Sequence, residues 1–140
     1  MYLIDTHVVS EARKGDKANP GVTSFFRQVA DQGAVIYLSV ISVGELRRGI
    51  ELIRYRRNVL QAKLLEAWLG EVLDQFRDNI LAFDTEAAQV WGRLRVPHAE
   101  HEIDKQMAAI ALVNSLTVVT RNTSDFAGTG VALRNPFLVA

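Results

Sequence analysis

The sequence of 140 residues contains no cysteine and no apolar run long enough to cross a bilayer. Without cysteine, disulfide bridges, thiolate catalysis and thiolate zinc sites are all excluded. A membrane-spanning helix needs about 20 mostly apolar residues in succession. The apolar residues at the start are too few for a signal peptide, because Asp5 interrupts them. From these absences we expect a cytoplasmic protein that does not bind membranes.

The formal net charge of the sequence is zero, since 16 basic side chains balance 16 acidic ones. This balance argues against a protein held to nucleic acid mainly by bulk positive charge, but it leaves open a local basic patch around an acidic site. The sequence has no internal repeat, no low-complexity tract and no linker rich in proline or serine. Its length is typical of one domain with a proper core, so we predict a single domain over residues 1–140.

Short apolar runs alternate with helical patterns along the chain. Runs rich in β-branched and aromatic residues predict strands at residues 2–4, 35–40, 80–83, 116–120 and 131–134. The spacing of apolar residues predicts a helix that opens at Ser42 and others at residues 7–13, 21–32, 56–77, 85–95 and 103–114. Strands that alternate with helices favour an α/β fold with a mainly parallel sheet.

Three acidic residues stand where predicted strands end or where the following helices begin: Asp5, Glu45 and Asp104. A helix that follows a parallel strand begins at the carboxyl end of the sheet, where ligands gather in such folds. Helix capping is the alternative explanation, because Asp is a favoured N-cap. The pattern Ser42-x-x-Glu45 also fits a capping box, and on that motif alone capping accounts better for Glu45.

Carboxylates that share one cleft repel each other unless a cation joins them. Mg²⁺ and Mn²⁺ take oxygen ligands and need only one or two direct carboxylates. Such a site polarises a phosphoryl oxygen and activates water, so its chemistry fits phosphodiester hydrolysis. His98 and His101 are three residues apart beside Pro97, and we interpret both as solvated loop side chains without a metal role.

Four segments, spread in order over nearly the whole chain, resemble the motifs of PIN-domain nucleases: residues 1–7, 39–49, 103–111 and 119–126. The second reads Ser-x-x-Ser-x-x-Glu-Leu-x-x-Gly, and the third reads Ile-Asp-x-x-Met-Ala-Ala-x-Ala. The most similar branch comprises the VapC and FitB-type toxins of bacterial toxin–antitoxin pairs, and the closing Asn-Pro-Phe at residues 135–137 is part of that resemblance.

This resemblance implies a PIN-like three-layer α/β/α sandwich and a toxin that is an endoribonuclease dependent on Mg²⁺ or Mn²⁺. Such an enzyme hydrolyses RNA phosphodiesters by means of metal-activated water. By motif match, Asp5, Glu45 and Asp104 are the expected metal ligands and catalytic acids, with Thr6 and Asn122 in supporting roles. The RNA target itself depends on shape and loop presentation, which no motif here encodes.

Two positions depart from the pattern of this branch. His7 stands where Asn is common, and we expect it to tune the site without loss of activity. Asn122 stands where the fourth motif often carries an acid, so the choice between one metal ion and two stays open. Asp125 is a possible substitute, although a turn residue is the slightly preferred reading. Arg121 is a predicted phosphate contact, as is Lys105, which is equally explained as a solvated residue of a first helical turn.

The resemblance also implies a homodimer or a higher assembly, and an antitoxin that lays an amphipathic helix into a groove. We place that groove on the helical hairpin between Leu46 and Leu64, around Ile50, Ile53 and Leu60. One alternative is a non-catalytic PIN-fold module that acts only through its antitoxin. A second is a phosphotransfer enzyme with a strand-end Asp as nucleophile, but the sequence has His instead of the second Asp that this chemistry needs two residues later.

Overall fold

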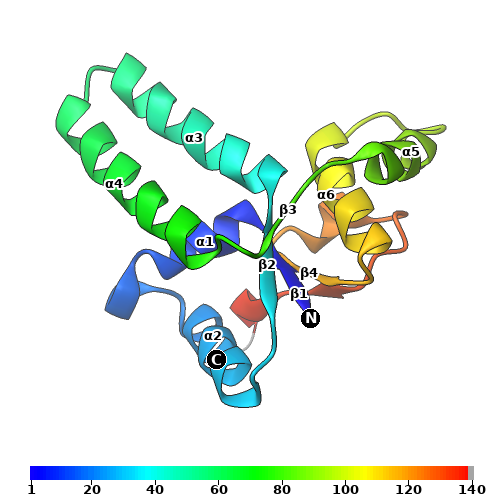
Figure 1. Cartoon of the computed structure of the whole chain (residues 1–140), viewed down its shortest axis with the longest axis horizontal. Helices are drawn as coiled ribbons and strands as arrows, with labels where there is room; N and C mark the ends of the chain where they lie inside the picture. Colours follow the sequence, from blue (N-terminus) through cyan, green and yellow to red (C-terminus); the bar gives the residue numbers. More distant parts are fainter. Residues whose placement is uncertain (139–140) are drawn as a thin grey trace.

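A five-stranded sheet lies at the centre of the computed structural model, which describes residues 1–138 (Figure 1). Each pair of neighbouring strands runs parallel, in the order β3-β2-β1-β4-β5. The strands are β1 (Tyr2–Ile4), β2 (Ile36–Ser39), β3 (Ile80–Leu81), β4 (Thr117–Val119) and β5 (Leu133–Arg134). This topology confirms the predicted α/β fold.

Helices cover both faces of the sheet and complete the predicted three-layer sandwich. One layer holds α1 (Thr6–Ala12), α2 (Pro20–Gln32), α3 (Val40–Tyr55) and α4 (Val59–Gln75). The opposite layer holds α5 (Thr85–Leu94) and α6 (Glu102–Val113), as Figure 1 shows. Short 3-10 turns complete the chain: η1 (Gly15–Lys17), η2 (Thr123–Phe126) and η3 (Pro136–Leu138). Within residues 1–138, no helix combines the length and the apolar character needed to cross a membrane.

The two central strands are buried on both faces. Leu3 packs into the core on the α5–α6 side and Ile4 into the core on the α1–α4 side. Val118 and Val119 of β4 divide in the same way. Successive side chains of a strand point to opposite faces, so an unbroken apolar run fills both cores. This burial holds β1 and β4 side by side, and their carboxyl ends open at the same edge of the sheet.

Helix α3 begins two residues earlier than predicted, and this changes the interpretation of Glu45. Ser39 is the N-cap, and its hydroxyl oxygen accepts a hydrogen bond from the Ser42 amide at 3.1 Å. Ser42 is therefore inside the helix, and Ser42-x-x-Glu45 is not a capping box. Glu45 lies in the second turn, beyond the reach of a capping role. The capping explanation for Glu45 is wrong, because two serines of similar capping propensity stand three residues apart.

The large apolar residues that recur every four positions in α4, from Leu60 to Phe76, do not all face the core. Leu60 and Leu64 are 72% and 61% exposed, and the buried side chains of this helix are Ala62, Leu65, Leu69 and Val72. A step of four residues overshoots one helical turn by about 40°, since a turn takes 3.6 residues. Four such steps, from Leu60 to Phe76, rotate by about 160°. Residues repeating every four positions over this distance therefore cannot share one face.

Two residues of the α3–α4 hairpin on which we predicted the partner groove face the core, while Leu60 and Leu64 are exposed. Leu46 and Ile50 are buried in the core and unavailable to a partner helix. A concave apolar surface lies elsewhere, in a cavity of about 490 Å³ between α1, α2 and α4. Its apolar lining includes Phe26, Trp68 and Phe76. The cavity is therefore lined by the side of α4 that faces α1 and α2, and Leu60 and Leu64 do not line it.

Candidate active site

Asp5 is the most firmly held acidic residue at the carboxyl ends of the strands. It follows β1 directly, and its side chain is only 4% exposed. Its Oδ1 accepts a hydrogen bond from the Thr6 amide at 2.7 Å, and its Oδ2 accepts one from the Thr120 hydroxyl at 2.7 Å. The first contact caps α1, which confirms the capping interpretation and still leaves the carboxylate at the carboxyl end of β1, where we predicted a site. Together the two bonds fix the carboxylate plane between β1 and β4.

Thr6 joins Asp5 to Glu45, although 39 residues separate Thr6 from Glu45 in sequence. Its hydroxyl donates to Glu45 Oε1 at 3.0 Å, while its amide donates to Asp5. Its hydroxyl also lies 3.0 Å from the buried Ser42 hydroxyl. The first turn of α1 thereby orients the carboxylate that α3 presents in its second turn. This places the predicted supporting residue Thr6 between two of the predicted acids.

Asp104 lies in the first turn of α6 and faces the same acidic site. Burial raises its pKa to about 6, with further contributions from the negative charges of Asp5, Asp125 and Glu45, while His101 opposes the rise. Three carboxylates therefore act electrostatically on Asp104, as like charges in a partly buried site do. The structure brings together the three acids predicted from the sequence and adds a fourth.

Asp125 is the fourth acid, and it is more than the turn residue that we preferred. It lies in η2, where its amide donates to the Asn122 carbonyl at 3.0 Å. The Asn122 amide in turn donates to the Thr120 hydroxyl at 3.1 Å, which itself donates to Asp5. Asn122 therefore participates through its backbone, by holding the turn that aims Asp125 toward α6. The acid missing from position 122 is supplied three residues later.

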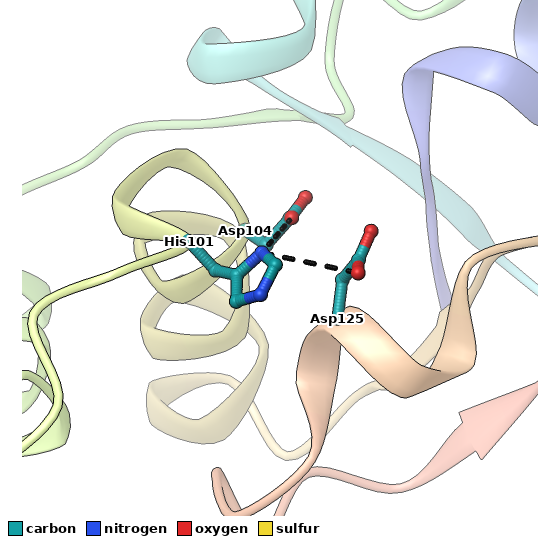
Figure 2. Close-up of side chains that lie close together, drawn as sticks. All are labelled: His101, Asp104 and Asp125. Atoms are coloured by element: carbon teal, nitrogen blue, oxygen red, sulfur yellow. Dashed lines mark ion pairs between the residues drawn. The ribbon is translucent and has the colours of Figure 1, made fainter.

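His101 also belongs to this cluster, which the sequence did not lead us to expect. Its Nδ1 lies 3.8 Å from Asp104 Oδ2 and 3.8 Å from Asp125 Oδ1, and Figure 2 shows the ring facing both carboxylates. His98, by contrast, is the solvated loop side chain that we predicted, with its ring 76% exposed and 3.6 Å from Glu100. The one indication in the sequence is the spacing of three residues that separates His101 from Asp104 across the start of a helix.

The two predicted phosphate contacts have different surroundings. Lys105 is buried, and its ammonium group donates a hydrogen bond to the His98 carbonyl. Its charge therefore holds the loop before α6. Arg121 is exposed, follows Thr120 at the edge of the site, and has its guanidinium 5.0 Å from the centre of the Phe137 ring. Of the two, Arg121 is the side chain that solvent can reach.

A second basic side chain, which we had not singled out, lies beside the acids. Arg48 and Glu45 line a shared cavity of about 370 Å³ together with Ile41, Ile103 and Gln106. Arg48 is exposed, one helical turn after Glu45 on α3. Apolar and basic groups thus flank the acidic site, although the whole chain has no net charge.

The donor groups of this site fit a divalent cation. Four carboxylates supply oxygen ligands of the kind that Mg²⁺ and Mn²⁺ prefer, and burial together with the charges of Asp5, Asp125 and Glu45 raises the pKa of Asp104. Asp5, Glu45 and Asp104 come from three different helix starts or strand ends, and Asp125 comes from a turn. A cation bound among them would relieve the repulsion that raises this pKa.

Three comparisons with known proteins all identify similarity to PIN-domain proteins. The sequence profile of the family described as PIN domain matches residues 2–131. The chain is 35% identical to Toxin FitB of Neisseria gonorrhoeae, across 98% of this chain and 99% of that protein. It is 30% identical to VapC ribonuclease Y4jK of Sinorhizobium fredii, across 98% of each. The crystal structure of FitAcB from Neisseria gonorrhoeae aligns with a TM-score of 0.82 and 33% identity, over 98% of this chain and 99% of that chain.

Proposed function

This chain belongs to the PIN domain family, and we propose that it is a divalent-metal-dependent endoribonuclease acting as the toxin of a toxin–antitoxin pair. The observation that carries the proposal is the gathering of four carboxylates, Asp5, Glu45, Asp104 and Asp125, at one edge of the sheet. The relative named VapC ribonuclease, at 30% identity over nearly the full length, supports RNA as the substrate.

Asp5, Glu45 and Asp104 would hold Mg²⁺ or Mn²⁺, with Asp125 completing the set. When bound, the cation supplies charge that polarises a phosphodiester and lowers the pKa of water. The residues of this chain hold the carboxylates in place before a cation binds. Two hydrogen bonds fix both oxygens of Asp5, and the Thr6 hydroxyl fixes one oxygen of Glu45. A carboxylate already held in one orientation loses little entropy when it becomes a ligand.

RNA reaches the site past basic side chains. We assign Arg48 and Arg121 as contacts for the phosphates that flank the reacting one. Arg48 lines a cavity with Glu45, and Arg121 is exposed and directly follows Thr120, whose hydroxyl donates to Asp5. Lys105 is left out of this set, since its ammonium is bonded to the His98 carbonyl. Arginine suits the role because its planar fork can bind a phosphate with two hydrogen bonds at once.

The antitoxin and the assembly are part of the same proposal. We place the antitoxin segment in the cavity of about 490 Å³ between α1, α2 and α4, where Trp68 and Phe76 offer apolar contacts and Arg13 offers a positive charge. An amphipathic helix with an acidic margin fits this lining. The relative named Toxin FitB supports the toxin role, and we expect a homodimer.

RNA cleavage by the purified full chain tests the proposal. We expect cleavage with Mg²⁺ or Mn²⁺, none with EDTA, and a loss of at least about 100-fold in Asp5→Asn, since even groups that only support a metal ligand cost 10–100-fold when removed. Asp16→Asn, an exposed acid in η1, is the matched control and should cleave like the parent. Cleavage no greater than that of Asp5→Asn would leave the non-catalytic binding module in its place.

A further inference from the structure

We propose that His101 is a nitrogen ligand to a divalent cation held together with Asp104 and Asp125, and that this ligand makes the site prefer Mn²⁺ over Mg²⁺. The inference rests on the proposed function, because it concerns the same acidic site. It adds an imidazole to a set of ligands that is otherwise made of carboxylates. Figure 2 shows the three side chains turned toward one another, with His101 and Asp104 from the start of α6 and Asp125 from η2.

The distances fit ligands of one cation better than they fit hydrogen bonds. His101 Nδ1 lies 3.8 Å from an oxygen of each aspartate, which is beyond the range of a hydrogen bond. Two ligands at about 2.1 Å from a shared octahedral cation lie about 3.0 to 4.2 Å apart. All three ligand atoms lie within 4.8 Å of one another. Small side-chain rotations therefore suffice to bring them onto one ion.

The backbone of His101 leaves its ring available for this contact. His101 is the N-cap residue of α6, but no side-chain hydrogen bond caps the helix there. Its φ of 57° lies in the left-handed region, which is uncommon for residues other than glycine and in which asparagine, aspartate and histidine are enriched. The imidazole makes no hydrogen bond to the helix amides that an N-cap usually serves, and it faces the carboxylates of α6 and η2.

An imidazole changes which cations the site accepts. Mg²⁺ binds oxygen almost exclusively, whereas imidazole is a good ligand for first-row transition metals. Affinity for a mixed nitrogen and oxygen site rises from Mn²⁺ toward the later metals of the row. A site with His101 should therefore bind Mn²⁺ more tightly than Mg²⁺. The competing explanation is that His101 is only a protonated counter-ion for the two aspartates.

Replacement of His101 by asparagine separates these two roles. Asparagine tolerates the left-handed backbone, so His101→Asn should fold, and it removes the imidazole nitrogen. His98→Asn is the matched control, because it changes an exposed histidine three residues away and keeps the carbonyl that Lys105 contacts. Calorimetric titration of each full-length protein with MnCl₂ and with MgCl₂ measures both affinities. Electron spin echo spectroscopy of the Mn²⁺ complex detects a coordinated ¹⁴N directly.

We expect ¹⁴N coupling in the parent protein and in His98→Asn, and none in His101→Asn. We also expect His101→Asn to bind Mn²⁺ about 10-fold more weakly, with Mg²⁺ affinity changed by less than about 2-fold. Absence of the coupling in the parent, or its persistence in His101→Asn, overturns the inference. A counter-ion role predicts the opposite sign, since loss of a positive charge would strengthen binding of both cations. If Asp5-dependent RNA cleavage persists without the coupling, only the His101 ligand is refuted and the proposed function stands.

Discussion

Replacing Asp104 with asparagine should stabilise the metal-free protein at neutral pH while it abolishes RNA cleavage. The pKa of Asp104 rises from 3.8 to about 6 in the folded chain because burial and three neighbouring carboxylates disfavour its charged form. Folding therefore opposes ionisation of this side chain. Asparagine keeps the shape of the protonated acid and removes the charge, so the variant avoids that penalty.

The sign and size of the effect follow from proton linkage. A raised pKa in the folded state gives stability that is fully present below pH 3.8 and is lost as the pH rises through about 6. Each unit of pKa shift corresponds to about 1.4 kcal/mol, so the full loss is at most about 3 kcal/mol. Of this, about 2 kcal/mol falls between pH 4.5 and pH 7. The difference in unfolding free energy between Asp104→Asn and the parent should grow by up to that amount across this interval.

Urea denaturation in EDTA at several pH values between 4.5 and 7 measures this difference. For a chain of this length, 2 kcal/mol corresponds to about 6 °C in melting temperature, so thermal unfolding provides an independent measurement. Asp16→Asn is the control for loss of an exposed carboxylate. Mn²⁺ at 100 times its Kd should add about 2.7 kcal/mol to the parent and bring the two proteins level or reverse their order. A difference that does not change with pH, or a variant less stable than the parent at pH 7, would refute electrostatic crowding around Asp104.

Two further predictions concern single contacts of the site. Thr120→Val removes the hydroxyl that donates to buried Asp5 Oδ2, and we expect a loss of about 1–3 kcal/mol in unfolding free energy because an acceptor is left unsatisfied; urea denaturation measures it, and a change below about 0.5 kcal/mol would contradict the contact. Arg48→Gln should weaken binding of RNA to the catalytically inactive Asp5→Asn protein and reduce the slope of log affinity against log salt by about 1, with an unchanged melting temperature. Filter binding at several salt concentrations measures the slope, and an unaltered slope would exclude Arg48 as a phosphate contact.

Most of the fold was predictable because its determinants are local. The apolar runs that include Leu3 and Val118 identify buried parallel strands, and their alternation with helices leaves few topologies open. The predicted start of α3 was wrong because two nearby residues have the same local preference for the N-cap position. Ser39 and Ser42 are equally good N-caps, and tertiary packing decides between them. The repeat of four residues from Leu60 onward drifts around the helix, so spacing alone does not tell which of these residues reach the core.

The site was predictable to the extent that its residues follow regular elements. Asp5, Glu45 and Asp104 each stand at or near a junction of strand and helix, and parallel topology brings such junctions to one edge of the sheet. Asp125 and His101 belong to a 3-10 turn and to a residue with positive φ, whose conformations depend on the rest of the fold. No spacing rule connects residues 101 and 125, so their approach to 3.8 Å could be found only in three dimensions.

Asp5 and Asp104 have different environments within the same acidic site, and this difference indicates different roles. Asp5 accepts two hydrogen bonds at 2.7 Å and is almost fully buried, so its charge is met by donors that are present whether or not a cation is bound. The raised pKa of Asp104 reflects burial among like charges with only His101 in opposition. In the proposed nuclease, Asp5 would fix the position of the site, and Asp104 would be the acid whose charge a bound cation compensates. Burial and the neighbouring carboxylates both disfavour the charged form of Asp104 in the metal-free chain, and a bound cation would offset this cost, so the stability gained in Asp104→Asn should be lost when Mn²⁺ is added.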